Sequence, residues 1–485
     1  MRAEIGAAPA VASDFTFALQ RRVPPSDPRS MPALLQLNAV TSPIFGGIAR
    51  SPVPVLLPFD TAAYIEAQRN GPESGVALSR FQAEFRPVDM FEAGPAGYDA
   101  VFSLEPGAGA GLPQRTFARP IEVQITGSLL TYDIADPAGG KGDPVKSLAA
   151  QYPDLRRFIR EGYVRYAFIR FGVPYVVSIP CLDSTPRARR LACHEAYPVA
   201  ERFLKALHVA GGRPSRPRFD IPAGSAERPT EPSSDFTYRA PGNIITGSGY
   251  HKQTGRIDFN AYSQIRFPVE APAFVHSQSF GRRGSSDKSD KPTATYPWRD
   301  NFCESRSFEV GQCANGFGHQ GEDIRPGACP TKREGADACD PKEQPTFAVR
   351  DGVVIRSLKQ QAATLQVNSR TEHIRFRYMH MNPSAMDADG VLNGRRVAEG
   401  EKLGVVSNYL DHPNGTSRHL HFDVQVFTRD GWIWVNPYVT LISSYERLIR
   451  GRGHEIGPEV ASAPAVAGAM PANTAHPDQQ EGSEN

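Results

Sequence analysis

The sequence predicts a mainly antiparallel β fold for its C-terminal half, preceded by a β-rich, mixed α+β region. Hydrophobic residues alternate with a period of two in several stretches after residue 345, which is the pattern of half-buried strands. Glycine and proline number 43 each, which favours frequent turns over long helices. The chain has 485 residues, so two or three domains are expected, and its 40% hydrophobic content is enough for ordinary cores.

The first segment expected is an irregular arm over residues 1–35, which contains the breaker cluster "VPPSDPRS". Its Ala10-Val11-Ala12 run resembles the small-residue end of an export signal, so the arm could be what is left of one. Residues 36–275 form a β-rich region whose role the sequence leaves open. A proline-rich break near 211–235 could divide that region into two subdomains.

Within this region, "YVRYAFIRFGVPYVVSIP" predicts two strands joined at Gly172. Helices are predicted around 145–160 and around 194–210, the second ended by Gly211-Gly212. Residues 276–450 are expected to form the second domain. Residues 451–485 are rich in alanine, proline and serine, which is typical of a disordered tail.

Six cysteines fall into three close couples, and the simplest pairing joins each couple internally: Cys181–Cys193, Cys303–Cys313 and Cys329–Cys339. Disulfides predict an oxidising compartment and therefore export. The balance of 54 basic and 52 acidic residues, a net charge of +2, argues against binding nucleic acid by bulk electrostatics. No apolar run approaches the length of an integral membrane segment.

The candidate chemistry begins with the predicted strand "HIRFRYMH". Alternation places His380 on the same face as Ile374, Phe376 and Tyr378, so this histidine is expected to point toward buried surroundings. A satisfied core histidine is the alternative interpretation.

The next predicted strand, "RHLHFDV", holds two histidines two positions apart. His419 and His421 therefore leave the same face, while Leu420 and Phe422 anchor the other face in a core. Two imidazoles on one rigid strand suit one metal ligand and one acid/base group. The spacing alone does not say which histidine has which role.

The stretch "GHQGEDI" adds His319 and Asp323, with Gly321 expected to let the backbone bend between them. Together with one histidine of "HLH" they make two imidazoles and one carboxylate, a donor set typical of catalytic zinc. Bound Zn²⁺ lowers the pKa of a coordinated water to about 7. A solvated turn and chance spacing are the alternative interpretations.

These three pieces, in this order, resemble the motifs of the lysostaphin/LytM-type zinc metallopeptidases, the peptidoglycan endopeptidases. The motifs are His319 to Asp323, Tyr378-Met379-His380 and His419-Leu420-His421, and the resemblance covers about residues 316–437. It implies an antiparallel β fold with a narrow groove over one Zn²⁺. It also implies that His319, Asp323 and His421 bind the metal, with His380 and His419 beside the metal-bound water.

The function expected is that of an exported, periplasmic or cell-envelope zinc endopeptidase that cuts the peptide cross-links of bacterial peptidoglycan. Its partners would be the stem peptides, with His419 as the preferred general base and His380 as the preferred oxyanion stabiliser. Residues 36–275 could bind the wall, recruit a partner or inhibit the site within the same chain. Two segments depart from the family: the long one after Asp323, with Cys329 and Cys339, and the one before His319, with Cys303 and Cys313. Both are predicted to be disulfide-pinned loops beside the groove.

Two other functions stay open. The chain could be a non-catalytic regulator or activator of another wall hydrolase on the same scaffold, although such members tend to lack the zinc ligands. It could also be a zinc peptidase of a protein substrate outside the wall.

Overall fold

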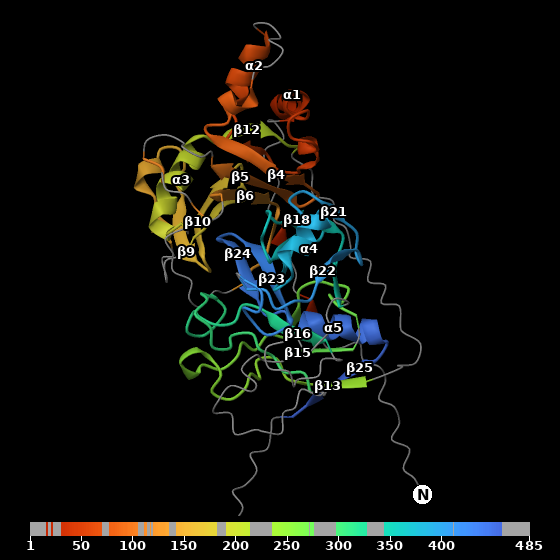
Figure 1. Ribbon diagram of the computed structural model, residues 1–485. Coiled ribbons are helices and arrows are strands. Elements are labelled where there is room, and N and C mark those ends of the chain that lie inside the picture. The colour runs from red at the N-terminus through yellow and green to blue at the C-terminus, as the bar shows by residue number, and fades with distance from the viewer. Residues whose placement is uncertain are drawn as a thin grey trace, which may run out of the picture.

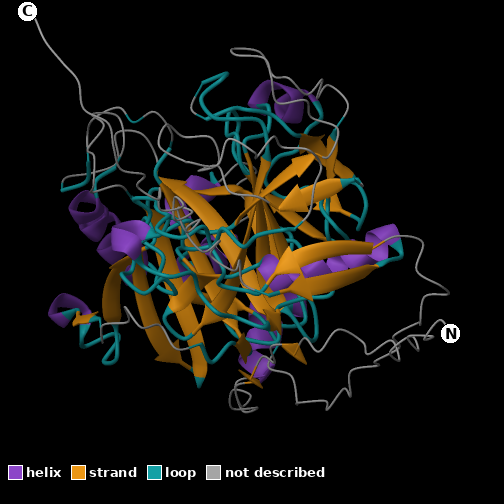
Figure 2. Ribbon diagram, turned by 90° about the horizontal axis from the view of Figure 1, so that it is seen from below, coloured by secondary structure: helices purple, strands orange, loops and turns teal. Residues whose placement is uncertain are grey.

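The computed structural model describes residues 16–17, 21–22, 31–69, 77–104, 111–113, 117, 120–134, 142–181, 191–213, 235–270, 272–275, 297–326, 344–410 and 412–457. Strands dominate over helices (Figure 2), as the sequence predicts. The helices are α1 (Met31–Thr41), α2 (Thr61–Arg69), α3 (Cys193–Lys205), α4 (Pro383–Ala388) and α5 (Tyr438–Ile449). Among the described residues, no helix combines the length and hydropathy that crossing a membrane requires.

Strands of the first half are β1 (Thr16–Phe17), β2 (Arg21–Arg22), β3 (Val55–Leu57), β4 (Phe85–Ala93), β5 (Gly97–Leu104), β6 (Glu122–Ser128), β7 (Leu130–Thr131), β8 (Asp143–Pro144), β9 (Arg156–Arg160), β10 (Tyr163–Arg170), β11 (Val173–Pro180) and β12 (His208–Gly211). Seven of them form an antiparallel sheet in the order β4-β5-β6-β11-β10-β9-β8. This N-terminal sheet, orange to yellow in Figure 1, packs with α3 around a core that runs from Phe45 to Ala210.

Strands of the second half are β13 (Asp235–Arg239), β14 (Asn260–Ala261), β15 (Ala273–Val275), β16 (Glu322–Pro326), β17 (Pro345–Phe347), β18 (Gly352–Ile355), β19 (Ala363–Asn368), β20 (His373–Met379), β21 (Arg396–Val397), β22 (Lys402–Val405), β23 (Leu420–Thr428), β24 (Gly431–Val435) and β25 (Arg452–Ile456). Eight form the C-terminal sheet, in the order β15-β16-β23-β20-β19-β18-β21 with β24 also paired to β23. Its pairs are antiparallel.

The two faces of β20 and β23 differ in polarity: one packs into a hydrophobic core and the other carries polar side chains. Phe376, Tyr378 and Phe422 point into the second hydrophobic core, which also takes in α5. The opposite face carries the register pairs Arg377↔Asp423 and Met379↔His421. Polar side chains on this second face therefore lie along the same strands whose other face holds the core together.

The N-terminal sheet packs against one end of that polar face. Asp99 of β5 accepts hydrogen bonds from His373 Nε2 at 2.7 Å and from Arg375 at 3.1 Å, and all three side chains are buried. Trp432 of β24 donates to the hydroxyl of Thr126 on β6 at 3.1 Å. The two sheets are thus joined by buried polar contacts rather than by a linker alone.

The second core begins before the boundary that the sequence predicts at residue 275. Side chains from Phe236 to Val275 pack in it together with those after residue 297, and the first core ends at Ala210. The change of core therefore coincides with the predicted break near 211–235. The division into 36–275 and 276–450 stays a prediction.

Two end segments differ from expectation. The predicted irregular arm over 1–35 is wrong in two places. Residues 16–17 and 21–22 form the short strands β1 and β2, and α1 begins at Met31 and buries Leu34. The predicted tail from 451 is wrong for 452–456, because β25 pairs in parallel with β13 and this pairing satisfies its backbone. The rest of the tail, from residue 458, lies outside the described residues.

The helix predicted over 145–160 is also wrong. A single 3₁₀ turn covers Lys146–Leu148, and Arg156–Arg160 form β9. Pro153 disfavours helix at the residue before it and lacks an N–H group. The second predicted helix is confirmed as α3, although it ends at Lys205 and His208–Gly211 form β12 instead.

Two of the predicted disulfides are confirmed, Cys181–Cys193 and Cys303–Cys313. The predicted Cys329–Cys339 bridge and its loop lie outside the described residues. The other loop expected to border the groove is described and is closed by Cys303–Cys313.

Candidate metal centre

Two of the predicted metal ligands are direct cross-strand neighbours. Asp323 on β16 lies opposite His421 on β23, in antiparallel register. Gly321 makes this approach possible, because a Cβ there would lie 2.4 Å from the carbonyl oxygen of Phe422. The chain bends at Gly321, as the sequence predicts, but its φ angle is not positive, so the need for glycine comes from the close packing of the two strands.

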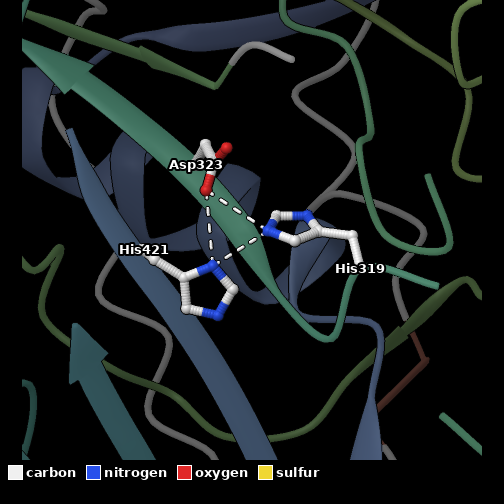
Figure 3. Close-up of side chains that lie close together, drawn as sticks. All are labelled: His319, Asp323 and His421. Atoms are coloured by element: carbon white, nitrogen blue, oxygen red, sulfur yellow. Dashed lines mark hydrogen bonds and ion pairs between the residues drawn. The ribbon is translucent and has the colours of Figure 1, made fainter. Parts of the chain in front are cut away.

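The third predicted ligand, His319, completes the cluster (Figure 3). Its Nε2 lies 2.9 Å from His421 Nδ1 and 3.3 Å from Asp323 Oδ1. The His421 Nδ1 to Asp323 Oδ1 distance is also 3.3 Å. All three side chains are buried, with 0–3% of their surface exposed.

A hydrogen bond on the far side of the His319 ring fixes which of its nitrogens carries the proton. His319 Nδ1 lies 3.0 Å from the carbonyl oxygen of Asn301, which can only accept, so Nδ1 donates and Nε2 keeps its lone pair. His421 has a carboxylate on each side of its ring: Nε2 lies 3.3 Å from Asp423 Oδ2 without a hydrogen bond, and Nδ1 lies 3.3 Å from Asp323 Oδ1. One nitrogen of each ring and a carboxylate oxygen therefore meet at one point.

This arrangement fits a tetrahedral cation. Ligand bonds of about 2.0–2.1 Å, usual for Zn²⁺ with nitrogen and oxygen donors, give tetrahedron edges of about 3.3 Å. The observed separations are 2.9, 3.3 and 3.3 Å. Asp323 Oδ2 is buried and has no hydrogen-bond partner among the described residues, which leaves a second carboxylate oxygen for a cation. Within the described part of the chain, His319, Asp323 and His421 form a group that could hold a metal ion.

Both predicted catalytic histidines lie beside this group. The ring of His380 is centred 4.6 Å from that of His419 and 6.0 Å from that of His421. His419 Nε2 is 3.2 Å from Asp323 Oδ1, and its Nδ1 is 2.7 Å from the carbonyl oxygen of Ser417. The structure thus brings all five predicted site residues together.

His380 reaches the cluster by a route that alternation does not predict. It follows the last residue of β20 and has a left-handed backbone, with φ of 67°. Regular alternation would place it on the core face with Tyr378, away from His421. The left-handed turn swings it to the polar face, where its Nδ1 donates to the carbonyl of Tyr409 at 2.9 Å.

The titration of these groups follows from their burial. Burial lowers the pKa of His319 to about 4, lowers that of His380 well below its usual range, and lowers that of His419. Burial alone would raise the pKa of Asp323, but the neighbouring His419 and His319 outweigh it and hold that pKa well below the usual range. The imidazoles of His319, His380 and His419 are therefore neutral bases at pH 7, facing an ionised carboxylate.

Three supporting residues were missed by the sequence reasoning. Asn301 accepts the N–H of Asp323 on its side-chain oxygen at 3.1 Å while its carbonyl holds His319. Arg377 and Trp434 donate to the carboxylate of Asp423, at 2.7 and 3.1 Å. Only the pairing of Arg377 with Asp423 could have been found, from the register of two predicted strands.

Asp423 lies beside the ring of His421, with 3.3 Å between its Oδ2 and Nε2. Burial would lower the pKa of His421, but the carboxylates of Asp323 and Asp423 outweigh it and raise that pKa. The carboxylate of Asp423 is fully buried, so its contacts are screened little by solvent. Its negative charge, 3.3 Å from His421 Nε2, favours a proton on that nitrogen.

Comparison with known proteins yields no matching family model and no matching curated protein. Among solved structures, similar chains include one described as the glycyl-glycine endopeptidase LytM from Ruminococcus gnavus, with 18% identity and a TM-score of 0.23 over 39% of this chain. Another is the antimicrobial peptidase lysostaphin from Staphylococcus simulans, with 20% identity and a TM-score of 0.18 over 32% of this chain. The matches span 62% and 51% of those chains. The likeness is distant and partial.

Proposed function

We propose that this protein is an exported, zinc-dependent endopeptidase that hydrolyses the peptide cross-links of bacterial peptidoglycan. The observation that carries the proposal is the meeting of His319 Nε2, His421 Nδ1 and Asp323 Oδ1 within 3.3 Å, with the His319 nitrogen kept unprotonated by the bond from its Nδ1 to Asn301. Without a cation or an extra proton, three electron-rich atoms would repel one another in a buried space. When bound, Zn²⁺ polarises a peptide carbonyl and makes water acidic enough to attack it near pH 7.

His419 is assigned the role of general base. Its Nδ1–H donates to the carbonyl of Ser417, and its Nε2 faces the donor set, 3.2 Å from Asp323 Oδ1, so Nε2 is the atom assigned to accept a proton. Its lowered pKa keeps it unprotonated at neutral pH. A proton taken from the attacking water at Nε2 is then available for the leaving amine.

His380 is assigned the stabilisation of the developing oxyanion. Its Nδ1–H is already used by Tyr409, so Nε2 is the atom that faces the site. That nitrogen can donate to an oxyanion only after it has taken up a proton. Its lowered pKa opposes this uptake, so the developing negative charge beside it has to favour the proton. The two histidines could exchange roles, because each presents an unprotonated Nε2.

The wall substrate is supported by the resemblance of the three sequence motifs, whereas the donor set supports only metal-dependent hydrolysis. Two disulfides are compatible with an oxidising, extracytoplasmic compartment. The groove over the site, the exact bond cleaved and the role of residues 36–275 in wall binding or inhibition stay predictions.

The proposal is tested by incubating purified peptidoglycan with the zinc-loaded full-length protein and analysing the released fragments by chromatography with mass detection. We expect cross-linked dimers to fall, monomers to rise and glycan strands to stay intact. A chelator should abolish this change, and Zn²⁺ should restore it.

Two variants sharpen the test. Asp323→Ala removes a metal donor and should abolish cleavage and zinc binding together, whereas His419→Ala should abolish cleavage while zinc stays bound. His412→Ala is the matched control, because His412 is exposed and bonds only locally to Pro413. Zinc binding without any change in the wall fragments would contradict the wall substrate and favour the non-wall peptidase or the regulator.

A further inference from the structure

Glu161 has an unusual place in the N-terminal sheet. It lies in the two-residue turn between β9 and β10, with φ of 52°, and Gly162 beside it has φ of 73°. Such a turn favours asparagine, aspartate or glycine at its first position, and a left-handed glutamate there costs about 1 kcal/mol. Hairpin tips usually face solvent, yet Glu161 is only 3% exposed. A strained, buried acid in this position indicates a role beyond closing the hairpin.

Its carboxylate is shared between the two halves of the chain. Oε2 accepts from Arg165 of the same sheet at 2.9 Å, in a pair that is buried on both sides. Oε1 faces two backbone N–H groups of the C-terminal half, those of Gly311 at 3.3 Å and Trp434 at 3.4 Å. Glu161 N–H in turn donates to Glu309 at 3.0 Å.

One of these contacts leads to His319. Gly311 belongs to the loop closed by the Cys303–Cys313 disulfide. The same loop pairs with the backbone of His319, since Cys303 N–H donates to the His319 carbonyl at 2.9 Å and His319 N–H donates to the Glu304 carbonyl at 2.8 Å. A shift of this loop would therefore move the metal ligand that it borders.

The other contact leads to His421. Trp434 lies in a small buried cluster with Phe302, Val310 and the Cys303–Cys313 bridge. Its indole N–H donates to Asp423 Oδ1 at 3.1 Å, and Asp423 Oδ2 lies 3.3 Å from His421 Nε2. The indole thus connects the backbone held by Glu161 to the carboxylate that lies beside His421 Nε2.

We infer that Glu161 is a positioning residue for the metal centre, through which the N-terminal sheet holds His319 and His421 at their metal-binding separation. The inference rests on the metal site proposed above. It makes residues of the N-terminal sheet part of the site's support, in addition to any wall-binding or inhibitory role they have. Glu161 touches neither metal donors nor substrate, so its effect passes through the disulfide loop and Trp434.

The test uses the full-length protein and compares Glu161→Gln with Asp99→Asn. Both are buried carboxylates of the N-terminal sheet that pair with arginine and contact the C-terminal half, but Asp99 contacts it through His373 and Arg375 rather than through the site's supports. Zn²⁺ affinity is measured by competition with a chromophoric chelator. The absorption spectrum of the Co²⁺-substituted protein reports ligand geometry without any assay of activity.

Glu161→Gln is expected to weaken Zn²⁺ binding about tenfold and to shift the Co²⁺ spectrum. A tenfold loss is the smallest that is typical when a residue that supports a metal ligand is removed. Asp99→Asn is expected to lower stability and leave both metal readouts unchanged. Since an unpaired Arg165 could prevent folding, Glu161→Gln/Arg165→Met removes both charges and should give the same metal phenotype.

Wild-type Zn²⁺ affinity and an unchanged Co²⁺ spectrum in the folded Glu161 variants would overturn the inference. An equal loss in Asp99→Asn would also overturn it, because the effect would then be general destabilisation. Failure of the unmutated protein to bind Zn²⁺ would instead overturn the metal site itself and this inference with it.

Discussion

Asp423→Asn is the sharpest probe of the metal centre. The substitution keeps the size of the side chain but removes the charge that faces His421 Nε2 at 3.3 Å and accepts from Arg377 and Trp434. The proton of His421 is then free to sit on Nδ1, where it blocks metal binding. Loss of such a support typically costs 10- to 100-fold in metal affinity, and about thirtyfold corresponds to about 2 kcal/mol.

Two independent assays measure this quantity. Competition with a chromophoric chelator gives the change in Zn²⁺ affinity. Denaturant unfolding with and without Zn²⁺ gives the stabilisation by the metal, which should shrink by the same ~2 kcal/mol when the metal is in excess. Asp430→Asn is the control, because Asp430 is an exposed aspartate in the turn that follows β23. Wild-type affinity in Asp423→Asn would refute the assignment of the tautomer.

Three further predictions follow from the same geometry. The free energy of unfolding of the metal-free protein should fall by up to about 3 kcal/mol as the pH drops from about 6.5 toward 4. The reason is that His319 binds a proton in this range when the chain is unfolded, whereas in the folded protein burial lowers its pKa to about 4. The free energy of unfolding of His319→Gln should depend less steeply on pH. Gly321→Ala should destabilise the protein by about 1–3 kcal/mol and weaken Zn²⁺ binding, because its Cβ would meet the backbone of Phe422 at 2.4 Å; normal zinc binding there would contradict the close-packing role. Removing the Cys303–Cys313 bridge should cost about 2–3 kcal/mol and weaken zinc binding, whereas removing Cys181–Cys193 should cost stability alone, as unfolding curves and chelator competition would reveal.

The ligand cluster was predictable because its residues lie close together in short motifs. Strand alternation places His419 and His421 on one face, and that pattern survives in the structure, although His419 itself precedes β23 and only bridges to Ser407. His380 was found by its motif rather than by its predicted orientation. A left-handed residue at the end of a strand reverses the face on which its side chain lies. The identity of the residue as histidine does not predict this backbone conformation.

The supports of the site were beyond sequence reasoning for a different reason. Asn301, Trp434 and Glu161 come from separate segments and meet only after both sheets have packed. In the sequence none of them stands out, because an amide in a loop, an aromatic residue on a strand and an acid in a turn are all common. Their roles depend on which backbone groups the tertiary fold leaves to be satisfied, and local patterns do not encode that.

The pairing of β16 with β23 has a consequence for the order of folding. Asp323 and His421 are 98 residues apart in the chain. Bringing such distant segments together costs about 4 kcal/mol of chain entropy before the contacts between them can stabilise the structure. In the unfolded chain, the nearby His319 and Asp323 form only a bidentate fragment with weak affinity. Metal capture should thus be a late event, coupled to closure of the C-terminal sheet, and a nascent or translocating chain would hold Zn²⁺ poorly until that sheet is complete.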